Sequence, residues 1–333
     1  MKINRFLKSL SIMLTLTMMM SVTMMTTLAT STQAAASFNE YYYGSNFYFK
    51  VYVPSTYTGA TSVPLMVMLH GCTQDPDDFA AGTRMNTLAE QKNFIVLYPE
   101  MNILANPNRC WNWFYDYNQH RGGTSEPAII AGMINWVKTN YKINSAEVNV
   151  AGISAGGAMT TIMGATYPDH VKGIGVSAGV MYDAADTANY ALTAMAYGSG
   201  YDPNVKGLYA YNEMGSYKHR MPVILFHGTS DYTVSINNAT EVINQWLQTN
   251  DYIDDGSDNN TVNTGADSTS SGTTNGRSWT KYVFNDKNGA SLVQYYKITG
   301  MGHAWSGGSS SGSYTDTSGP NESQIMWDFF ASH

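Results

Sequence analysis

The feature that most limits the possible folds is a short pattern, Gly152-Ile153-Ser154-Ala155-Gly156, which directly follows the apolar run at 148–151. Glycines on both sides of the serine permit a sharp turn from a strand into a helix, where flanking side chains would clash. The Ser154 hydroxyl would then project above the carboxyl end of a sheet, as a nucleophile does. A glycine-rich helix start without any catalytic role is the alternative interpretation.

Apolar strands and helical segments alternate along most of the chain. Short apolar or β-rich runs, typical of strands, occur at 47–53, 64–69, 94–98, 147–151, 173–177 and 223–226. Helical spacing is found at 77–91, 126–141, 155–167, 236–250 and 321–331. This alternation predicts an α/β fold with a mostly parallel central sheet and helices on both faces.

Three segments have weaker patterns. Residues 178–220 lack clear periodicity and suggest a lid or irregular excursion, with an ordinary helix and loop as the alternative. The polar stretch 254–276 suggests a mobile surface loop. The β-rich segments 279–285 and 292–298, on either side of Asn288-Gly289, predict a hairpin.

The N-terminus has the layout of a secretory signal peptide. Three basic residues within the first eight precede an apolar stretch at 10–28, and the small residues Ala34-Ala35-Ala36 end it. We expect residues 1–36 to be removed and residues 37–333 to form one catalytic domain in a secreted, extracellular protein. Serines and threonines interrupt the apolar stretch, which disfavours an uncleaved anchor and any stable membrane association.

Charge narrows the range of partners. Because residues 1–36 carry three basic and no acidic side chains, the net charge of −7 becomes −10 after cleavage, which argues against nucleic acid. The acidic run at 251–258 lacks the spacing of a calcium loop, so we expect no metal and no other cofactor. No feature of the sequence indicates an oligomeric state.

The chain has two cysteines, Cys72 and Cys110, both in the part expected to be exported. An oxidising compartment favours a disulfide between them. Two buried free thiols are the alternative.

A serine nucleophile needs an imidazole to accept its proton, and we expect His303 to provide it. His303 lies in a glycine-flanked loop after the last β segment, where an imidazole can reach over the sheet edge. Three other downstream histidines are expected to be solvated: His170 after a helix end, His219 in a basic patch and His333 at the end of the chain.

The imidazole needs a carboxylate, and Asp231 is the candidate because it comes soon after the buried strand 223–226. No competing carboxylate follows a buried strand so closely; the competitors are Asp202, Glu213 and Asp286. The resulting order of serine, acid and histidine is that of an α/β-hydrolase.

An oxyanion hole requires two backbone NH groups. One would come from Ala155, and the loop after the strand 64–69 would supply the other. Cys72 is the preferred donor and Thr73 the alternative. His70 is expected to be a packed residue at the strand end.

Tryptophans near these loops are candidates for the substrate wall. Trp111 and Trp113 would be held beside the oxyanion loop by the disulfide, although core packing explains them equally well. Trp305, two residues after the proposed base, is the stronger wall candidate.

Several blocks in order resemble the polyhydroxybutyrate (PHB) depolymerase family of esterases, close to secreted feruloyl and acetylxylan esterases. The resemblance spans residues 47–331. Its blocks are Leu69-His70-Gly71-Cys72-Thr73-Gln74, Cys110-Trp111-Asn112-Trp113, Gly152-Ile153-Ser154-Ala155-Gly156-Gly157-Ala158-Met159, His227-Gly228 with Asp231, and Gly300-Met301-Gly302-His303-Ala304-Trp305.

The resemblance implies an α/β-hydrolase fold, the triad of Ser154, Asp231 and His303, an oxyanion hole at Cys72 and Ala155, and the Cys72–Cys110 bridge. It also implies a secreted serine esterase acting on poly(3-hydroxybutyrate)-type polyesters or their oligomers. A feruloyl or acetylxylan esterase is the rival, and an inactive surface-binding hydrolase scaffold is a remote alternative. Family members that attack crystalline polyester append a linker and a separate substrate-binding domain, which we do not expect here.

Overall fold

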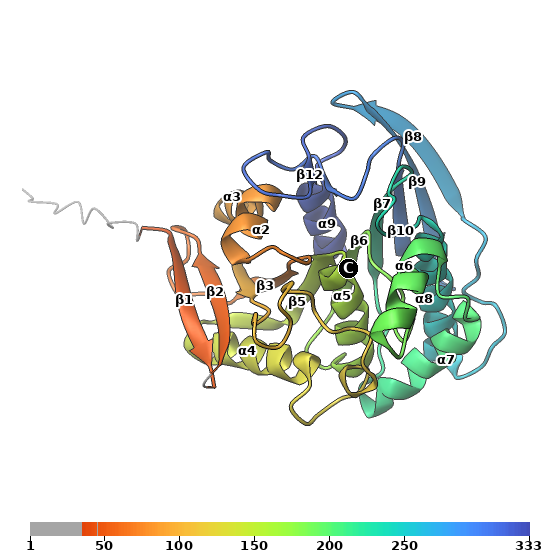
Figure 1. Cartoon of the computed structure of the whole chain (residues 1–333), viewed down its shortest axis with the longest axis horizontal. Helices are drawn as coiled ribbons and strands as arrows, with labels where there is room; N and C mark the ends of the chain where they lie inside the picture. The colour runs from red at the N-terminus through yellow and green to blue at the C-terminus, as the bar shows by residue number, and fades with distance from the viewer. Residues whose placement is uncertain (1–34, 45) are drawn as a thin grey trace, which may run out of the picture. The chain divides into compact units, whose positions relative to one another are not determined.

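The apolar runs become the centre of one large sheet in the computed structural model, which describes residues 35–44 and 46–333 (Figure 1). The predicted signal peptide therefore lies almost entirely outside the described residues. Within them, ten strands follow the spatial order β1 (Ser37–Tyr43), β2 (Phe47–Val53), β4 (Ile95–Pro99), β3 (Val63–Leu69), β5 (Ile143–Ile153), β6 (Gly173–Ser177), β7 (Val223–Gly228), β10 (Ser291–Ile298), β9 (Arg277–Asn285) and β8 (Ser268–Thr274).

The middle of the sheet is parallel and both edges are antiparallel. Strands β4, β3, β5, β6, β7 and β10 run in one direction. The β1–β2 hairpin pairs antiparallel at one edge, and β9 and β8 do so at the other. Figure 1 shows these two hairpins at opposite sides of the sheet. The predicted mostly parallel sheet is confirmed.

Both faces of the middle of the sheet are covered, which explains why strands such as β3 and β4 are continuously apolar. In β3, Leu65 and Val67 belong to one buried cluster and Met66 and Met68 to the other, because successive side chains point to opposite faces. The first face packs against α4 (Glu126–Asn140), α5 (Ala155–Thr166) and α8 (Asn237–Asp255), and the second against α2 (Pro76–Thr83), α3 (Met85–Lys92) and α9 (Glu322–Ala331).

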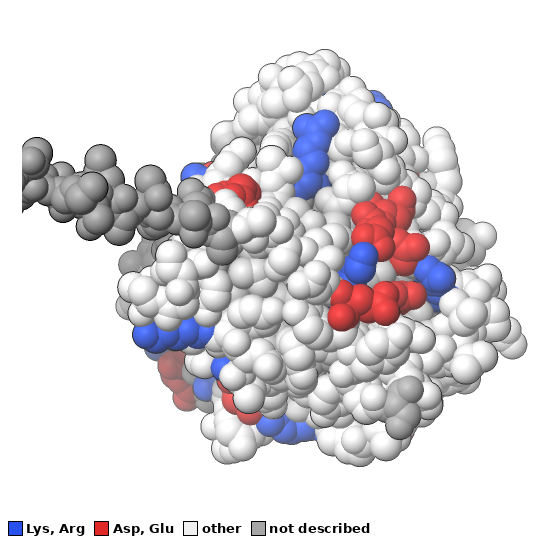
Figure 2. Space-filling model, turned by 90° about the vertical axis from the view of Figure 1, so that its left-hand side faces the viewer, with Lys and Arg blue, Asp and Glu red and all other residues white. Residues whose placement is uncertain are grey.

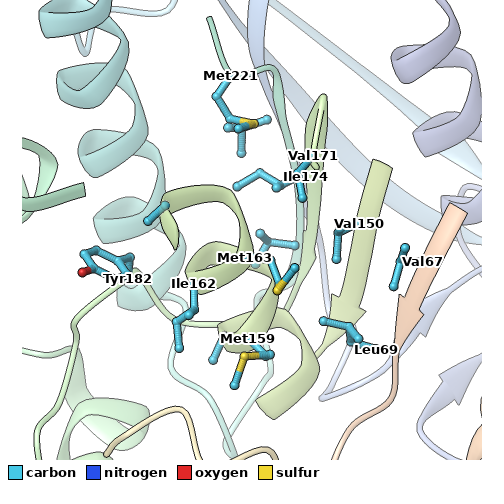
Figure 3. Packing of buried hydrophobic residues seen from close by; sticks show 14 of the residues in the cluster. Val67, Leu69, Val150, Met159, Ile162, Met163, Val171, Ile174, Tyr182 and Met221 are labelled. Atoms are coloured by element: carbon cyan, nitrogen blue, oxygen red, sulfur yellow. The ribbon is translucent and has the colours of Figure 1, made fainter. Parts of the chain in front are cut away.

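Methionines fill much of the first face. Met159 and Met163 of α5 belong to the same buried cluster as the strand residues Val67, Leu69 and Val150, and Figure 3 shows Met163 on the side of the helix toward Val150. Flexible thioether chains suit the irregular space between a twisted sheet and a helix.

Charge is sparse on the face drawn in Figure 2, where acidic and basic side chains gather in small groups on an otherwise uncharged surface. Ion pairs of this kind include Lys50 with Asp77 at 2.6 Å and Arg109 with Asp75 at 3.3 Å. In the part of the chain that the structure describes, no helix has both the length and the apolar character needed to cross a bilayer.

The single helix predicted at 77–91 is wrong, because α2 and α3 are separate helices. Arg84 between them has a left-handed backbone with φ of 55°. Gly82 just before it packs against Thr315, whose Cγ2 would lie 2.8 Å from an added Cβ. The left-handed backbone of Arg84 ends α2 there, and helical spacing alone does not reveal it.

The loop predicted at 254–276 is wrong in its second half, since β8 pairs there with β9. Its Ser- and Thr-rich side chains are mostly exposed on both faces, so no apolar alternation marks the strand. Asn275 and Gly276 have positive φ values of 46° and 80° and form the turn between the two strands. This Asn-Gly pair is the sequence feature that could have predicted the turn and the strands on either side of it.

Residues 178–220 contain two helices, α6 (Ala188–Tyr197) and α7 (Pro203–Glu213), instead of an irregular excursion. Thr187 and Asp202 cap their first turns by accepting hydrogen bonds from backbone NH groups. The helix-and-loop alternative is therefore the one observed. The strand β1, which the sequence did not predict, begins at Ser37, directly after the expected cleavage site.

Candidate active site

The candidate residues meet at the edge of the sheet where its parallel strands end. Ser154 follows β5, Asp231 follows β7, and His303 follows β10. The carboxyl ends of parallel strands lie at one edge, so loops that are distant in sequence converge there. The loop after β3, which carries Cys72, reaches the same edge.

Ser154 has a strained backbone, with φ of 57° and ψ of −122°. Both glycines of the pattern are required by close contacts. A Cβ on Gly156 would lie 2.0 Å from the carbonyl oxygen of Leu69, and one on Gly152 would lie 2.5 Å from Gly156. The Ser154 NH donates to the carbonyl of Ser177 at 2.9 Å, which fixes the turn.

Asp231 holds His303 in a defined orientation. Its Oδ2 lies 2.7 Å from His303 Nδ1, while its Oδ1 accepts hydrogen bonds from the NH groups of Thr233 and Val234, both at 2.9 Å. Burial raises the pKa of this carboxyl, but the His303 hydrogen bond and the other favourable interactions outweigh burial and lower it overall. Because an ionised carboxylate only accepts, Nδ1 carries the proton and Nε2 is left as an acceptor.

Ser154 and His303 line the same cavity of about 210 Å³, together with Met195, Thr233 and Tyr314. The structure records no hydrogen bond between the Ser154 hydroxyl and the imidazole among the described residues. Such bonds are often long in unliganded enzymes and tighten when substrate binds. The geometry therefore brings the three predicted triad residues to one site.

The competing carboxylates have other partners. Asp202 caps α7, Asp286 pairs with Arg220 at 2.7 Å, and Glu213 accepts from the backbone NH of Arg121. These contacts account for them structurally.

The backbone around Cys72 distinguishes the two oxyanion candidates. The Thr73 NH already donates to the carbonyl of Asn108 at 2.7 Å, so it is not available to a ligand. The Cys72 NH has no protein acceptor among the described residues, and neither has the Ala155 NH at the first position of α5. Both residues line the cavity beside Ser154.

Cys72 and Cys110 form the predicted disulfide. The segment that follows Cys110 is held by Glu126, the first residue of α4. The Glu126 carboxyl accepts hydrogen bonds from the backbone NH and the side-chain NH₂ of Asn112 at 2.8 and 2.7 Å. Burial raises the pKa of Glu126 to about 7, although Asn112 and Asn118 oppose the rise. The segment around Cys110 is thus attached to Cys72 by the disulfide and to α4 by a buried carboxyl.

His70 is a buried structural residue, as expected. Burial lowers the pKa of its imidazole to about 4, so it is neutral at physiological pH. Its Nε2 accepts from the Met101 NH at 3.1 Å, and its Nδ1 donates to the Gly71 carbonyl at 2.8 Å. His70 therefore braces the backbone that leads to Cys72.

The three tryptophans have different positions. Trp113 lines a cavity of about 280 Å³ beside Ser154. The expectation that Trp305 forms a substrate wall is wrong, because its ring is 1% exposed, packs edge-on against Phe79, and donates to Ser323. Trp111 is likewise a core residue, 3% exposed, with its indole NH bonded to the His70 carbonyl.

Sequence reasoning missed the residues that α6 contributes to the larger cavity. They are Ala188, Asn189, Ala191, Leu192 and Met195. Their helix was not predicted from the sequence, so no expectation marked them. Tyr314, which lies edge-on to His303 with ring centroids 6.1 Å apart, was also missed.

Comparison with known proteins defines the fold class first. The structure resembles an acetyl xylan esterase from Aspergillus awamori with a TM-score of 0.69 and 23% identity, over 89% of this chain and all of the other. The feruloyl esterase module of Clostridium thermocellum matches with a TM-score of 0.51 and 14% identity, over 82% of this chain and 83% of the other. The chain has the α/β-hydrolase fold.

Sequence comparison then identifies the family. The model of the PHB depolymerase esterases matches residues 47–268, so the chain belongs to that family. Poly(3-hydroxyalkanoate) depolymerase C from Paucimonas lemoignei is 35% identical over 73% of this chain and 55% of its own length. Acetylxylan esterase A from Talaromyces purpureogenus is 32% identical over 59% of this chain and 52% of its own. The chain thus spans about half the length of these two relatives.

We predict that the disulfide contributes strongly to stability. Its cysteines are 38 residues apart, so the chain-entropy model gives about 4 kcal/mol, or up to about 6 °C in Tm for a domain of this size. The Cys72→Ala/Cys110→Ala variant should lose that much in thermal unfolding followed by circular dichroism. Adding a reductant should lower the Tm of the wild type only. An equal response of the variant to reductant would contradict this assignment.

Proposed function

We propose that this protein is a secreted serine esterase that hydrolyses poly(3-hydroxybutyrate)-type polyesters or their oligomers. The observation that carries the proposal is the buried Asp231 carboxylate holding His303 at 2.7 Å, in a cavity that Ser154 also lines. The histidine is 10% exposed and the carboxylate is fully buried, so water does little to weaken their interaction. Family membership agrees with ester chemistry.

In the proposed reaction, Ser154 Oγ attacks the ester carbonyl while His303 Nε2 takes the hydroxyl proton. Asp231 stabilises the imidazolium that forms. The carbonyl oxygen becomes an oxyanion, which accepts hydrogen bonds from the NH groups of Cys72 and Ala155.

His303 then gives its proton to the departing alkoxide, leaving an acyl group on Ser154. Water, deprotonated by His303, attacks the acyl-enzyme, and the acid is released with Ser154 restored. Each step moves one proton through the same nitrogen, so one correctly oriented histidine serves both halves of the reaction.

The two cavities that meet at Ser154 suit the two halves of an ester. The leaving alcohol must lie within reach of His303, so it belongs in the smaller cavity, which His303 and Tyr314 line. The acyl group then extends into the larger one, where Ala155 and Trp113 meet α6. Among the described residues, no Asp, Glu, Lys or Arg lines either cavity, which favours an uncharged ester.

One of the relatives favours the polyester over the rival substrates. The depolymerase from Paucimonas lemoignei is 35% identical, whereas the acetylxylan esterase from Talaromyces purpureogenus and the feruloyl esterase B from Neurospora crassa are 32% and 30% identical. The mostly apolar lining of the larger cavity, in which the acyl group is placed, also suits an aliphatic acyl chain. A feruloyl or acetylxylan esterase remains the second candidate because of those relatives.

An extracellular location fits a water-insoluble substrate, which cannot enter a cell. The Cys72–Cys110 disulfide supports it, since disulfides persist in oxidising compartments.

We predict that Ser154→Ala abolishes hydrolysis of p-nitrophenyl butyrate. The rate constant kcat should fall by at least about 10⁴-fold, because the nucleophile and its base act as a unit. The assay is release of p-nitrophenol, with thermal unfolding as the control for folding. A variant that keeps the wild-type rate would rule out the mechanism.

Substrate choice is tested with amorphous poly(3-hydroxybutyrate), methyl ferulate and acetylated xylan. We expect soluble hydroxybutyrate products from the polyester at the highest kcat/KM, measured by chromatography of the supernatant. Hydrolysis of only the ferulate or the xylan would transfer the assignment to the second candidate. Ser154→Ala protein is the blank for each substrate.

The acyl assignment of the larger cavity predicts a chain-length effect at Leu192, which lines it from α6 and is 67% exposed. Leu192→Asp should lower kcat/KM for p-nitrophenyl octanoate by about fivefold, since roughly 1 kcal/mol of apolar contact with the acyl chain is lost. Hydrolysis of the acetate should change little. Thr193→Asp places the same charge on the same helix outside the cavity and serves as the control. Equal losses for both esters would refute the assignment.

A further inference from the structure

Behind the candidate site lies a buried acid that the proposed mechanism does not use. Glu322, the first residue of α9, has no exposed surface. Its Oε2 accepts a hydrogen bond from the Ser306 NH at 2.8 Å, whereas its Oε1 is buried without a hydrogen-bond partner. A carboxyl of this kind in a protein core requires a physical explanation.

A second buried polar atom lies beside it. The Ser177 hydroxyl also has no hydrogen-bond partner, and it acts on the Glu322 carboxyl by lowering its pKa. The two groups are therefore close, although their present geometry is not that of a hydrogen bond.

Ser306 and Ser177, the two neighbours of the Glu322 carboxyl, belong to opposite sides of the site. Ser177 ends β6, and its carbonyl accepts the hydrogen bond from the Ser154 NH at 2.9 Å. Ser306 lies three residues after His303, in the short strand β11 (Trp305–Ser306) that pairs with β12 (Thr315–Asp316). The Glu322 carboxyl thus lies between Ser177, which holds the backbone of Ser154, and Ser306, which belongs to the segment that follows His303.

The charge state of Glu322 follows from its surroundings. Burial raises the pKa of Glu322 to about 8, and only the Ser306 NH and the Ser177 hydroxyl oppose the rise. No charged side chain acts on it, whether from β6, from β11 or from its own helix. An ionised carboxylate without a cation is costly in such a place, so the neutral acid is the stable form at pH 7.

We propose that Glu322 is a positioning residue: its neutral carboxyl accepts from the Ser306 NH and donates to Ser177 Oγ, and so holds the His303 loop in register with Ser154. The acid acts through these supports and does not touch substrate. Its effect on the reaction rests on the proposed esterase function, whereas its effect on stability does not.

Ionisation should weaken this link as pH rises. The folded-state pKa of about 8 lies above the ordinary value of 4.5, so the stabilising contribution is fully present below about pH 4.5. It is lost progressively as pH rises through about 8. The Tm of the wild type should therefore fall between about pH 4.5 and pH 8, and its kcat should fall near pH 8, where the acid ionises in the folded protein.

The test compares Glu322→Gln, Glu322→Ala and the wild type. Glutamine is isosteric and uncharged, with an oxygen for the Ser306 NH and an NH₂ group for Ser177 Oγ. It should keep the wild-type kcat at pH 7 and lack the decline near pH 8. Alanine removes both contacts and should lower kcat by about 10- to 100-fold with little change in KM. Methyl butyrate hydrolysis in a pH-stat measures these rates without a titrating chromophore.

Asp328→Asn is the matched control, because Asp328 is an exposed acid on the same helix. This variant should keep the wild-type pH profile. Tm is measured for each protein from pH 5 to pH 9, and the Tm of Glu322→Gln should fall less than that of the wild type. The Tm comparison needs no catalysis, so it separates failure of this proposal from failure of the esterase assignment.

Three results would overturn the proposal. One is a pH dependence of Glu322→Gln equal to that of the wild type, both in kcat near pH 8 and in Tm from pH 5 to pH 8. Another is a loss of kcat at pH 7 as large in Glu322→Gln as in Glu322→Ala. The third is a change in the Asp328→Asn profile equal to that of Glu322→Gln.

Discussion

The close approach of α5 to the end of β3 is the contact on which the rest of the site depends. At Gly156 a Cβ would lie 2.0 Å from the carbonyl oxygen of Leu69, so only glycine allows the backbones to meet. Their meeting brings the NH of Cys72, just after β3, near the NH of Ala155, at the start of α5. The strained backbone of Ser154 is the conformational cost of that approach, and the surrounding hydrogen bonds maintain it.

The loops around Ser154 are held in place by uncharged contacts more than by ion pairs. The uncharged His70 imidazole supports the cysteine loop, and the disulfide closes it. Glu126 and Glu322 are buried carboxyls with raised pKa values that receive backbone NH groups from opposite sides of the site. Asp231 is the exception, with a lowered pKa, because it alone faces an imidazole that becomes charged in the proposed reaction.

Sequence patterns predicted the parts of the fold whose cause is local. The continuous apolar runs identified the parallel strands, and the order of Ser154, Asp231 and His303 placed each residue after one of them. Patterns failed where a distant contact decided the outcome. Arg84 breaks a helix beside a glycine that packs on Thr315, and Trp305 is buried because Phe79 and Ser323 enclose it. The strand β8 has no apolar face and was missed for that reason.

By itself, the sequence determined the alternation of strands and helices and the turn at Ser154, since these follow from residue type and spacing. With two cysteines it allowed one possible disulfide, which the structure contains. Only the tertiary structure decided that the Thr73 NH donates to the Asn108 carbonyl, that α6 lines the larger cavity, and that the Glu322 carboxyl accepts from the Ser306 NH close to the His303 loop. The reason is physical: a hydrogen-bond partner, a cavity wall and the surroundings of a buried acid depend on which segments meet in space, and one-dimensional spacing does not specify those meetings.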